Sequence, residues 1–163
     1  MEVAVPAIRG WLDHTGATMA RVLIADDDAD IRAVMRDVLE MQSHTVLEAE
    51  DAAHTLALLT ASNEPLVALV DLRMPGPSIA ELIERVLDEA NTAAGRHGIV
   101  FMSADVRALE TVPCDDLPGS ICVRLVKPFD VDRLIVLVAE VAARIAAPAL
   151  RAPLAPLRAD STK

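Results

Sequence analysis

Leu66-Val67-Ala68-Leu69-Val70 is an unbroken apolar run that ends at Asp71. A strand that is covered on both faces, as in a parallel sheet, has this pattern. Similar short strand-like runs occur at 22–25, 45–47, 99–102 and 121–126. Between these runs the apolar residues recur at intervals of three and four, which predicts amphipathic helices. Strands that alternate with helices indicate βαβ units and a parallel sheet.

The helical intervals complete the predicted fold. We expect helices over 31–39, around 56–59, and over 79–87, 105–111 and 130–145. The fourth helix must be short because Pro113 and Pro118 would break a longer one. Five strands and five helices predict an α/β fold with a doubly wound five-stranded parallel sheet, whose functional site lies at the carboxyl ends of the strands.

We expect one domain over residues 21–147. A poorly ordered N-terminal extension at 1–20 precedes it, and an Ala/Pro-rich mobile tail at 148–163 follows it. The 53% of hydrophobic residues in a chain of 163 can fill the core of one such domain.

Charge and hydropathy exclude two classes of partner. The 15 Lys and Arg residues against 25 Asp and Glu residues give a net charge of −10, which would repel a nucleic-acid backbone. The apolar stretches are shorter than the ~18 to 20 residues of a membrane span, and the N-terminus lacks the features of a secretory signal. We therefore expect no direct nucleic-acid binding, no membrane insertion and a cytoplasmic location.

The cysteines and histidines lack the spacing of a metal site. Cys114 and Cys122 stand eight residues apart without a CxxC motif, and the four histidines are scattered. We expect the two cysteines to be buried or idle thiols with no metal or redox role.

Polar residues follow four of the predicted strands. Asp26 and Asp27 follow the first strand and Asp71 the third, and Ser103 and Lys127 follow the fourth and fifth. At ~4 Å two carboxylates repel by about 4 kcal/mol at an effective dielectric constant of 20, so three of them need a cation or a raised pKa. Oxygen ligands of this kind suit Mg²⁺ or Mn²⁺.

The same residues suggest phosphorus chemistry. A carboxylate beside a metal can attack phosphorus as a nucleophile and form an aspartyl phosphate. A hydroxyl from Ser103 and the ammonium group of Lys127 would help to neutralise the transferring oxygens. Asp28 and Asp30, which also follow the first strand, are interpreted as caps of the next helix.

Four motifs occur in order at the strand ends: VLIADDD at 22–28, LVDLRMPG at 69–76, MSA at 102–104 and VKPF at 126–129. Together with Arg32 in the first helix, they resemble the receiver domains of bacterial two-component response regulators, in particular the stand-alone, single-domain type. The resemblance spans roughly residues 21–145, and it implies a flavodoxin-like receiver fold.

The resemblance also implies a role for each site residue. Asp71 would be the phosphoacceptor, Ser103 would bind the phosphoryl group and Lys127 would pair with it. Asp27 would bind Mg²⁺ directly, Asp26 mainly through water, and the backbone carbonyl of Arg73 would complete the protein ligands. In this family the bond between the lysine and the following proline, here Pro128, is typically cis.

The chain departs from the family pattern at two places. Pro77, Ser78 and Ile79 follow Gly76, where the family usually has an acidic residue and a glycine. Arg124 replaces the aromatic switch residue three positions before the lysine. An inward Arg124 would bury an unpaired charge at a cost of several kcal/mol, so we expect it to stay outward and to pair with an acidic residue of a partner.

The function predicted from these motifs is signalling rather than metabolism. A histidine kinase or histidine phosphotransfer protein would donate phosphate to Asp71, and the altered protein would contact a downstream protein target. Beyond self-catalysed phosphotransfer and slow autodephosphorylation we expect no enzyme activity. One alternative is a receiver-like scaffold that works without phosphorylation. A second is a haloacid-dehalogenase-type phosphohydrolase with Asp26 as nucleophile, although no second acidic motif follows 99–102.

The last helix leaves two interpretations open. Its predicted inward stripe consists of Val131, Leu134, Ile135, Val138, Val141 and Ile145. Val136 and Leu137 lie beyond this stripe. Either the helix has a broad core face, or these two residues meet a partner or a second copy, which would form a homodimer through the fifth strand and last helix.

Overall fold

The computed structural model describes residues 18–90, 97–116 and 121–147. Most of the predicted extension at 1–20 and all of the predicted tail at 148–163 lie outside these residues. Ala20, directly before the first strand, is buried. Within the described residues, no helix combines the length and the apolar character that a membrane crossing requires.

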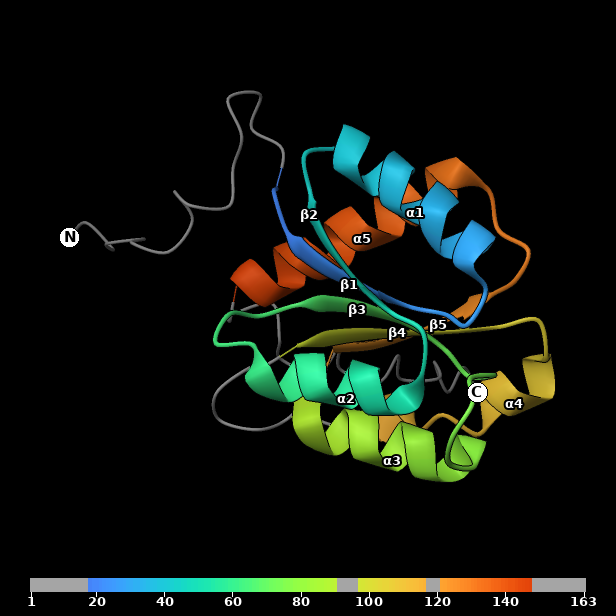
Figure 1. The fold of residues 1–163 in the computed structure, drawn as a ribbon. Coiled ribbons are helices and arrows are strands. Elements are labelled where there is room, and N and C mark those ends of the chain that lie inside the picture. Colours follow the sequence, from blue (N-terminus) through green and yellow to red (C-terminus); the bar gives the residue numbers. More distant parts are fainter. Residues whose placement is uncertain (1–17, 91–96, 117–120, 148–163) are drawn as a thin grey trace, which may run out of the picture.

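Five parallel strands form one sheet in the order β2-β1-β3-β4-β5 (Figure 1). The strands are β1 Arg21–Ala25, β2 Thr45–Ala49, β3 Val67–Asp71, β4 Gly98–Ser103 and β5 Ile121–Val126. The order reverses direction after β2, so β1 and β3 lie in the middle of the sheet beside the crevice that doubly wound sheets use for their sites. The predicted fold class is confirmed.

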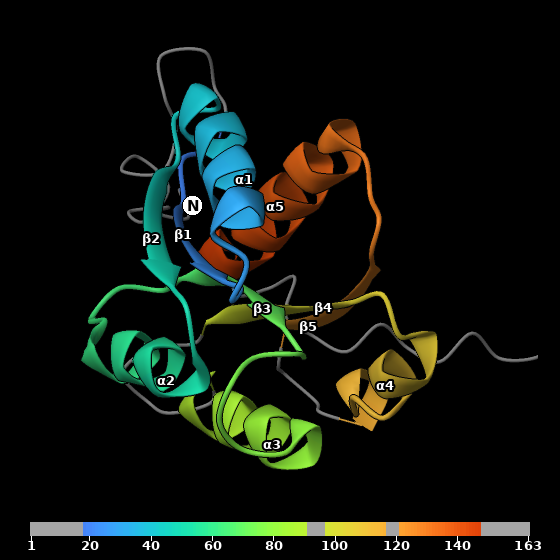
Figure 2. The same ribbon diagram turned by 45° about the vertical axis from the view of Figure 1, so that its right-hand side comes forward.

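Helices cover both faces of this sheet (Figure 2). They are α1 Ala29–Met41, α2 Ala52–Ala61, α3 Ile79–Ala90, α4 Val106–Glu110 and α5 Val131–Ala146, and a short 3₁₀ helix, η1, spans Cys114–Asp116. The helices α1 and α5 lie on one face, and α2 and α3 lie on the other. The five-residue α4 is as short as the prolines predict.

The strand β3 shows why the central strands lack polar residues. Its side chains point alternately to the two faces. Ala68 and Val70 pack in the core beneath α2 and α3, whereas Val67 and Leu69 pack in the core beneath α1 and α5. Both faces are therefore dry, and the apolar run that ends at Asp71 fills two cores at once.

Four helices begin at an aspartate that caps the first turn. In each case the carboxylate accepts hydrogen bonds from backbone N–H groups two or three residues later, which stabilises the helix start. The four caps are Asp28, Asp51, Asp105 and Asp130. The cap prediction is therefore confirmed for Asp28, while Asp30 lies in the first turn of α1.

The prediction of two idle thiols is wrong. Cys114 and Cys122 form a disulfide with their Cα atoms 5.0 Å apart, a separation typical of such bridges. Cys114 begins η1, and Cys122 is the second residue of β5. The chain between α4 and β5 returns close to the strand, and this return brings the two residues together.

The inward stripe of α5 was also partly mispredicted. Leu137 is 2% exposed and belongs to the core, whereas Val131 is 47% exposed. Val136 is exposed, as predicted. Because Ala142 is buried as well, α5 has the broad core face that was one of the two interpretations.

Two buried histidines connect neighbouring strands at their amino ends. His44 precedes β2, and its Nδ1 accepts a hydrogen bond from the N–H of Ala20 before β1, at 3.1 Å. His97 precedes β4, and its Nδ1 accepts from the N–H of Leu66 before β3, at 2.9 Å. The Nε2 of His97 lies 3.0 Å from the carbonyl oxygen of Leu59. Both bonds of His97 form together only in the neutral tautomer with its proton on Nε2.

Candidate functional site

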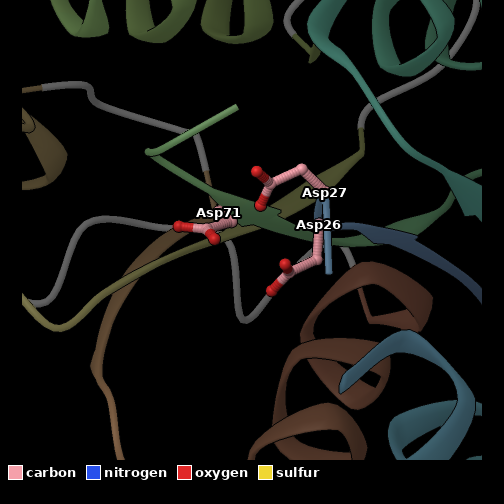
Figure 3. A group of neighbouring side chains, drawn as sticks. All are labelled: Asp26, Asp27 and Asp71. Carbon is pink, nitrogen blue, oxygen red and sulfur yellow. The ribbon is translucent and has the colours of Figure 1, made fainter. Parts of the chain in front are cut away.

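Three of the predicted site residues, the aspartates, meet at the carboxyl edge of the sheet (Figure 3). Asp26 and Asp27 follow β1, and Asp71 is the last residue of the neighbouring strand β3. Each of these three residues offers a carboxylate oxygen that lies within 4.8 Å of the others. The topology alone explains this clustering, because β1 and β3 pair in parallel and end at the same edge.

Lys127 joins two of the carboxylates. Its Nζ donates to Oδ2 of Asp26 at 2.6 Å and to Oδ2 of Asp71 at 3.1 Å. Asp26 is 1% exposed and Asp71 is 7% exposed, whereas Asp27 is exposed to solvent. The ammonium group therefore contacts both buried carboxylates and balances one of their two charges, and Asp27 lies on the open side of the site.

Backbone groups orient the two buried aspartates. The N–H of Arg73 donates to Oδ1 of Asp71 at 3.1 Å, and the N–H of Asp28 donates to Oδ1 of Asp26 at 2.9 Å. Arg32 Nη1 donates to the backbone carbonyl of Asp26 at 2.6 Å. Each buried carboxylate thus receives one backbone hydrogen bond and one bond from Lys127, which is how buried charges are normally tolerated.

Burial and neighbouring charges shift two pKa values at the site. Burial raises the pKa of Asp71, and the charge of Asp26 adds to the rise, while the N–H of Arg73 and the charge of Lys127 oppose it. Burial by itself would lower the pKa of Lys127, but its hydrogen bonds and charge interactions with Asp26 and Asp71 outweigh burial and raise that pKa. Lys127 therefore remains a cation, and the cluster calls for further positive charge.

Ser103 lies at the end of β4, beside the end of β3. Asp71 is in register with Met102, so Ser103 comes one residue beyond it. Its side chain is buried, and its Oγ accepts a hydrogen bond from the N–H of Asp105 at 3.0 Å. The N–H of Lys127 donates to the backbone carbonyl of Ser103 at 2.9 Å, which ties the ends of β4 and β5 together.

The loop after Asp71, whose sequence departs from the family pattern at 77–79, leads directly into α3. Gly76 has a φ of +129°, a conformation that side chains rarely permit. Ser78 then begins α3, because its Oγ accepts from the N–H of Glu81 and its carbonyl oxygen accepts from the N–H of Leu82. The peptide bond between Lys127 and Pro128 is cis, as expected.

Arg124 does not point outward to a partner, so that expectation is wrong. Its Nε donates to the carbonyl oxygen of Leu109 at 3.0 Å, and its Nη2 donates to the carbonyl oxygen of Val112. Its Nη1 pairs with Asp115 at 3.1 Å. The charge is thus satisfied inside the chain by carbonyl groups at the end of α4, which sequence reasoning had no means of placing.

The three aspartates suit a hard divalent cation. All ligand atoms are oxygens, and an exposed carboxylate from Asp27 leaves room for the waters that Mg²⁺ usually retains. Asp28 does not belong to the cluster, because its carboxylate caps α1 through the N–H groups of Asp30 and Ile31. Three carboxylates and Lys127 carry a formal charge of −2, which one divalent cation balances.

An apolar groove beside the site was not predicted. It has a volume of about 430 Å³ and lies between α1 and the segment from Lys127 into α5. Ile31 and Val34 share the helical spacing of the buried residues Met35 and Leu39 of α1, yet both are exposed, Val34 to 60%. The apolar stripe of α1 is wider than the core needs, and this excess was the available signal.

Comparison with known proteins identifies relatives of this chain. The family model of the response regulator receiver domain matches residues 22–139. Sporulation initiation phosphotransferase F of Bacillus subtilis (strain 168) is 26% identical over 121 residues, which cover 70% of this chain and 86% of that protein. The transcriptional regulatory protein ResD of the same strain is 32% identical over 81 residues, which cover 50% of this chain but only 32% of ResD.

Solved structures agree with the fold. Full-length FixJ from B. japonicum has a TM-score of 0.63 at 29% identity, with 80% of this chain and 60% of FixJ covered. A CheY-like receiver domain protein from Methanospirillum hungatei JF-1 has a TM-score of 0.58 at 23% identity, with 77% and 95% covered, and this likeness concerns the fold alone. Since the family model covers most of the chain and the strand-end motifs come together in space, the chain belongs to the response regulator receiver domain family.

Proposed function

We propose that this domain accepts a phosphoryl group on Asp71 and passes the signal on by protein contact. The observation that carries the proposal is the buried Asp71 carboxylate, which contacts Lys127 and lies within 4.8 Å of Asp26 and Asp27. Receiver domains are signalling proteins rather than classical enzymes, and they generally bind Mg²⁺ at an acidic pocket. The arrangement here has the groups that such a reaction requires.

In the proposed step, a carboxylate oxygen of Asp71 attacks the phosphorus of a phosphohistidine on the donor protein. The P–O bond forms as the P–N bond breaks, and the imidazole leaves with the electron pair and takes up a proton. The backbone N–H of Arg73 holds the attacking carboxylate in place. Lys127 Nζ then pairs with the new phosphoryl group, and the Ser103 hydroxyl donates a hydrogen bond to it.

Asp27 and Asp71 would bind Mg²⁺ or Mn²⁺ directly, Asp26 would bind it through water, and the backbone carbonyl of Arg73 would complete the protein ligands. The cation would supply positive charge that neutralises the transferring oxygens. The residues of the chain do the remaining work. Lys127 Nζ pairs with both Asp26 and Asp71, and burial limits the access of water to the acyl phosphate.

Acetyl phosphate and Mg²⁺ test the proposal without a cognate kinase. The intact mass should increase by one phosphoryl group, and hydroxylamine should remove it because acyl phosphates are labile. Asp71→Asn should abolish the increase, since an amide is not a nucleophile, and Asp88→Asn on the exposed side of α3 is the matched control. Unchanged labelling of Asp71→Asn would exclude this acceptor, and no labelling at all would favour the phosphorylation-independent scaffold.

The donor is proposed to be a histidine kinase or histidine phosphotransfer protein that docks on the groove between α1 and α5. Any protein donor must bring its phosphohistidine to the edge formed by Asp27 and Lys127. The exposed apolar residues Ile31, Val34 and Val131 lie beside that edge and line the groove. An apolar surface at this place fits a protein helix better than a free small molecule.

Phosphotransfer profiling tests the docking surface. Purified histidine kinases are autophosphorylated with labelled ATP, and the kinase that phosphorylates this protein fastest is selected. Val34→Ser should slow transfer from that kinase roughly tenfold or more because an interface contact is lost, while labelling by acetyl phosphate stays unchanged. Equal slowing with both donors would show that the variant damages the site and not the docking surface.

The output partner is proposed to be a downstream protein or a second copy of this chain. Val126 at the end of β5 and Val136 on α5 are exposed apolar residues that a protein partner could contact. We further propose a cytoplasmic location, one domain over residues 21–147, and no direct binding of nucleic acid.

Asp28 would be essential in a haloacid-dehalogenase-type phosphohydrolase that uses Asp26. The Asp28 carboxylate instead caps α1, which disfavours that alternative.

A further inference from the structure

The chain after α4 is held against β5 by two separate connections. The first is Arg124, whose guanidinium group binds the carbonyl oxygens of Leu109 and Val112 and pairs with Asp115. The second is the disulfide that joins Cys114 to Cys122. The connections start from Cys122 and Arg124, two residues apart in β5, and end on the same short stretch of chain.

This stretch leads directly back to the proposed phosphorylation site. Ser103 ends β4, and its Oγ accepts the hydrogen bond from the N–H of Asp105, the residue that caps α4. Residues 103–114 therefore form one link with the site at its near end and Cys114 at its far end. Figure 2 shows α4 beside the ends of β4 and β5, apart from α3. If Ser103 moves toward a phosphoryl group, α4 must follow, and a fixed far end resists that motion.

The environment of the bridge favours reversibility. Cys114 and Cys122 are both partly exposed, and β5 is an edge strand of the sheet. In the cytoplasm, which is the proposed location, disulfides are reduced unless they have a transient or sensing role. Cys114 and Cys122 pack only as partly buried residues against the core beneath α2 and α3, and Arg124 still holds the segment when the bridge is open.

We infer that Cys114 and Cys122 form a reversible redox site, at which a dithiol reductant opens the bridge and removes one of the two attachments of the segment that follows α4. The redox step is inferred from the disulfide and its surroundings. Its effect on signalling rests on the proposed phosphorylation of Asp71. The reductant belongs to the class of dithiol proteins or small dithiols. The oxidised protein is the restrained form, and the reduced protein is the responsive form.

The reaction is a two-electron thiol–disulfide exchange. A thiolate of the dithiol attacks one sulfur of the bridge, the S–S bond breaks, and a mixed disulfide forms with that cysteine. The second thiol of the reductant then displaces the cysteine and closes a disulfide within the reductant. Two electrons and two protons pass to the protein, which ends with thiols at Cys114 and Cys122.

Thiol trapping and hydrogen exchange test the redox site on the full chain. Dithiothreitol should open the bridge in native buffer while the far-ultraviolet circular dichroism stays that of the folded protein. Amide exchange within 106–115 should then become at least about tenfold faster, because the segment loses one of its two attachments. The chain has only two cysteines, so the reductant has no other bridge to break.

The double variant Cys114→Ser/Cys122→Ser is the matched control. It should exchange like the reduced protein, and dithiothreitol should not change it. Arg124→Gln in the oxidised protein should speed exchange less than reduction does, and the two changes together should speed it most. A bridge that opens only when the whole domain unfolds, or an unchanged exchange rate after reduction, would overturn the inference.

A phosphoryl mimic separates this inference from the proposed function. With beryllium fluoride and Mg²⁺, the exchange rates within 106–115 should change more in the reduced protein than in the oxidised protein. An equal change in both forms would show that the bridge does not restrain the response. If Asp71 takes no phosphate in either form, the proposed function fails, while the effect of dithiothreitol alone still decides whether the redox site exists.

Discussion

At the scale of single residues, the site separates buried charges from an exposed one. Asp26 and Asp71 are buried and share the ammonium group of Lys127, which balances one of their two negative charges before any cation binds. Asp27 is exposed and has no such compensation from Lys127 in the described hydrogen bonds. We therefore expect the Asp27 carboxylate to be the strongest of the three ligands for a cation.

Asp27→Ala should weaken Mg²⁺ binding roughly 10- to 100-fold, a loss typical of a damaged metal site. Isothermal titration calorimetry with MgCl₂ measures this directly. Asp28→Ala is the control, because Asp28 caps α1 and should affect stability by about 1 kcal/mol rather than metal binding. If both variants lost Mg²⁺ equally, the assignment of Asp28 as a cap alone would be wrong.

At the scale of elements, a close contact between β4 and α5 depends on a missing side chain. Gly98 begins β4 beneath α5, and a Cβ added there would lie 2.4 Å from Cγ1 of Val141 and 3.1 Å from Cδ1 of Ile145. Both neighbours are buried, so neither can move freely. The helix can approach β4 this closely only because residue 98 has no side chain.

Gly98→Ala should lower the free energy of unfolding by about 1–3 kcal/mol, because the core becomes overpacked. Val141→Ala removes the atom that the new methyl group meets, so the double variant should lose less stability than the sum of the two single variants. Urea denaturation of all four proteins gives the coupling free energy. Strictly additive losses would mean that α5 shifts away instead of clashing.

The order of the elements and the clustering of the candidate site residues were predictable, because both follow from local patterns. Apolar runs give the strand ends, and parallel pairing then places Asp26, Asp71 and Lys127 together without further information. The phase of α5 was harder to predict. A helix with many apolar residues fits several inward stripes, and only packing decides between Leu137 and Val131.

The connection between α4 and β5 was not predictable for a different reason. The bridge of Cys114 to Cys122 and the bonds of Arg124 depend on the path of an irregular segment, which no periodic pattern describes. The roles of His44 and His97 depend on which strands are neighbours. The two histidines look unrelated in the sequence, but each precedes a strand and bonds to the backbone before the neighbouring strand.

At the scale of the whole molecule, these two histidines make stability depend on pH. Burial lowers the pKa of His44. Burial also lowers the pKa of His97, although its bond to the carbonyl of Leu59 and the charge of Glu89 oppose the effect. Above the unfolded-state pKa of about 6.5 both states are neutral and stability is complete. Below it the unfolded chain binds protons first, so stability falls as pH falls.

The free energy of unfolding should therefore decrease between about pH 7 and pH 5.5, by at most about 1.4 kcal/mol per pH unit for each histidine. Urea denaturation at several pH values measures the slope. The double variant His44→Gln/His97→Gln should flatten it, whereas His54→Gln, at an exposed position of α2, should leave it unchanged. If the slope persists in the double variant, groups other than His44 and His97 cause the pH dependence.

The two edge strands, β2 and β5, each have one charged residue, Glu48 and Arg124. Glu48 pairs with Arg36 at 3.1 Å, and Arg124 pairs with Asp115. Edge strands offer open N–H and C=O groups to any extended chain, which is how many proteins begin to aggregate. A foreign strand added at either edge would have to bury a charge or break an ion pair. These two residues therefore help to keep crowded copies of the protein from joining edge to edge into amyloid-like assemblies.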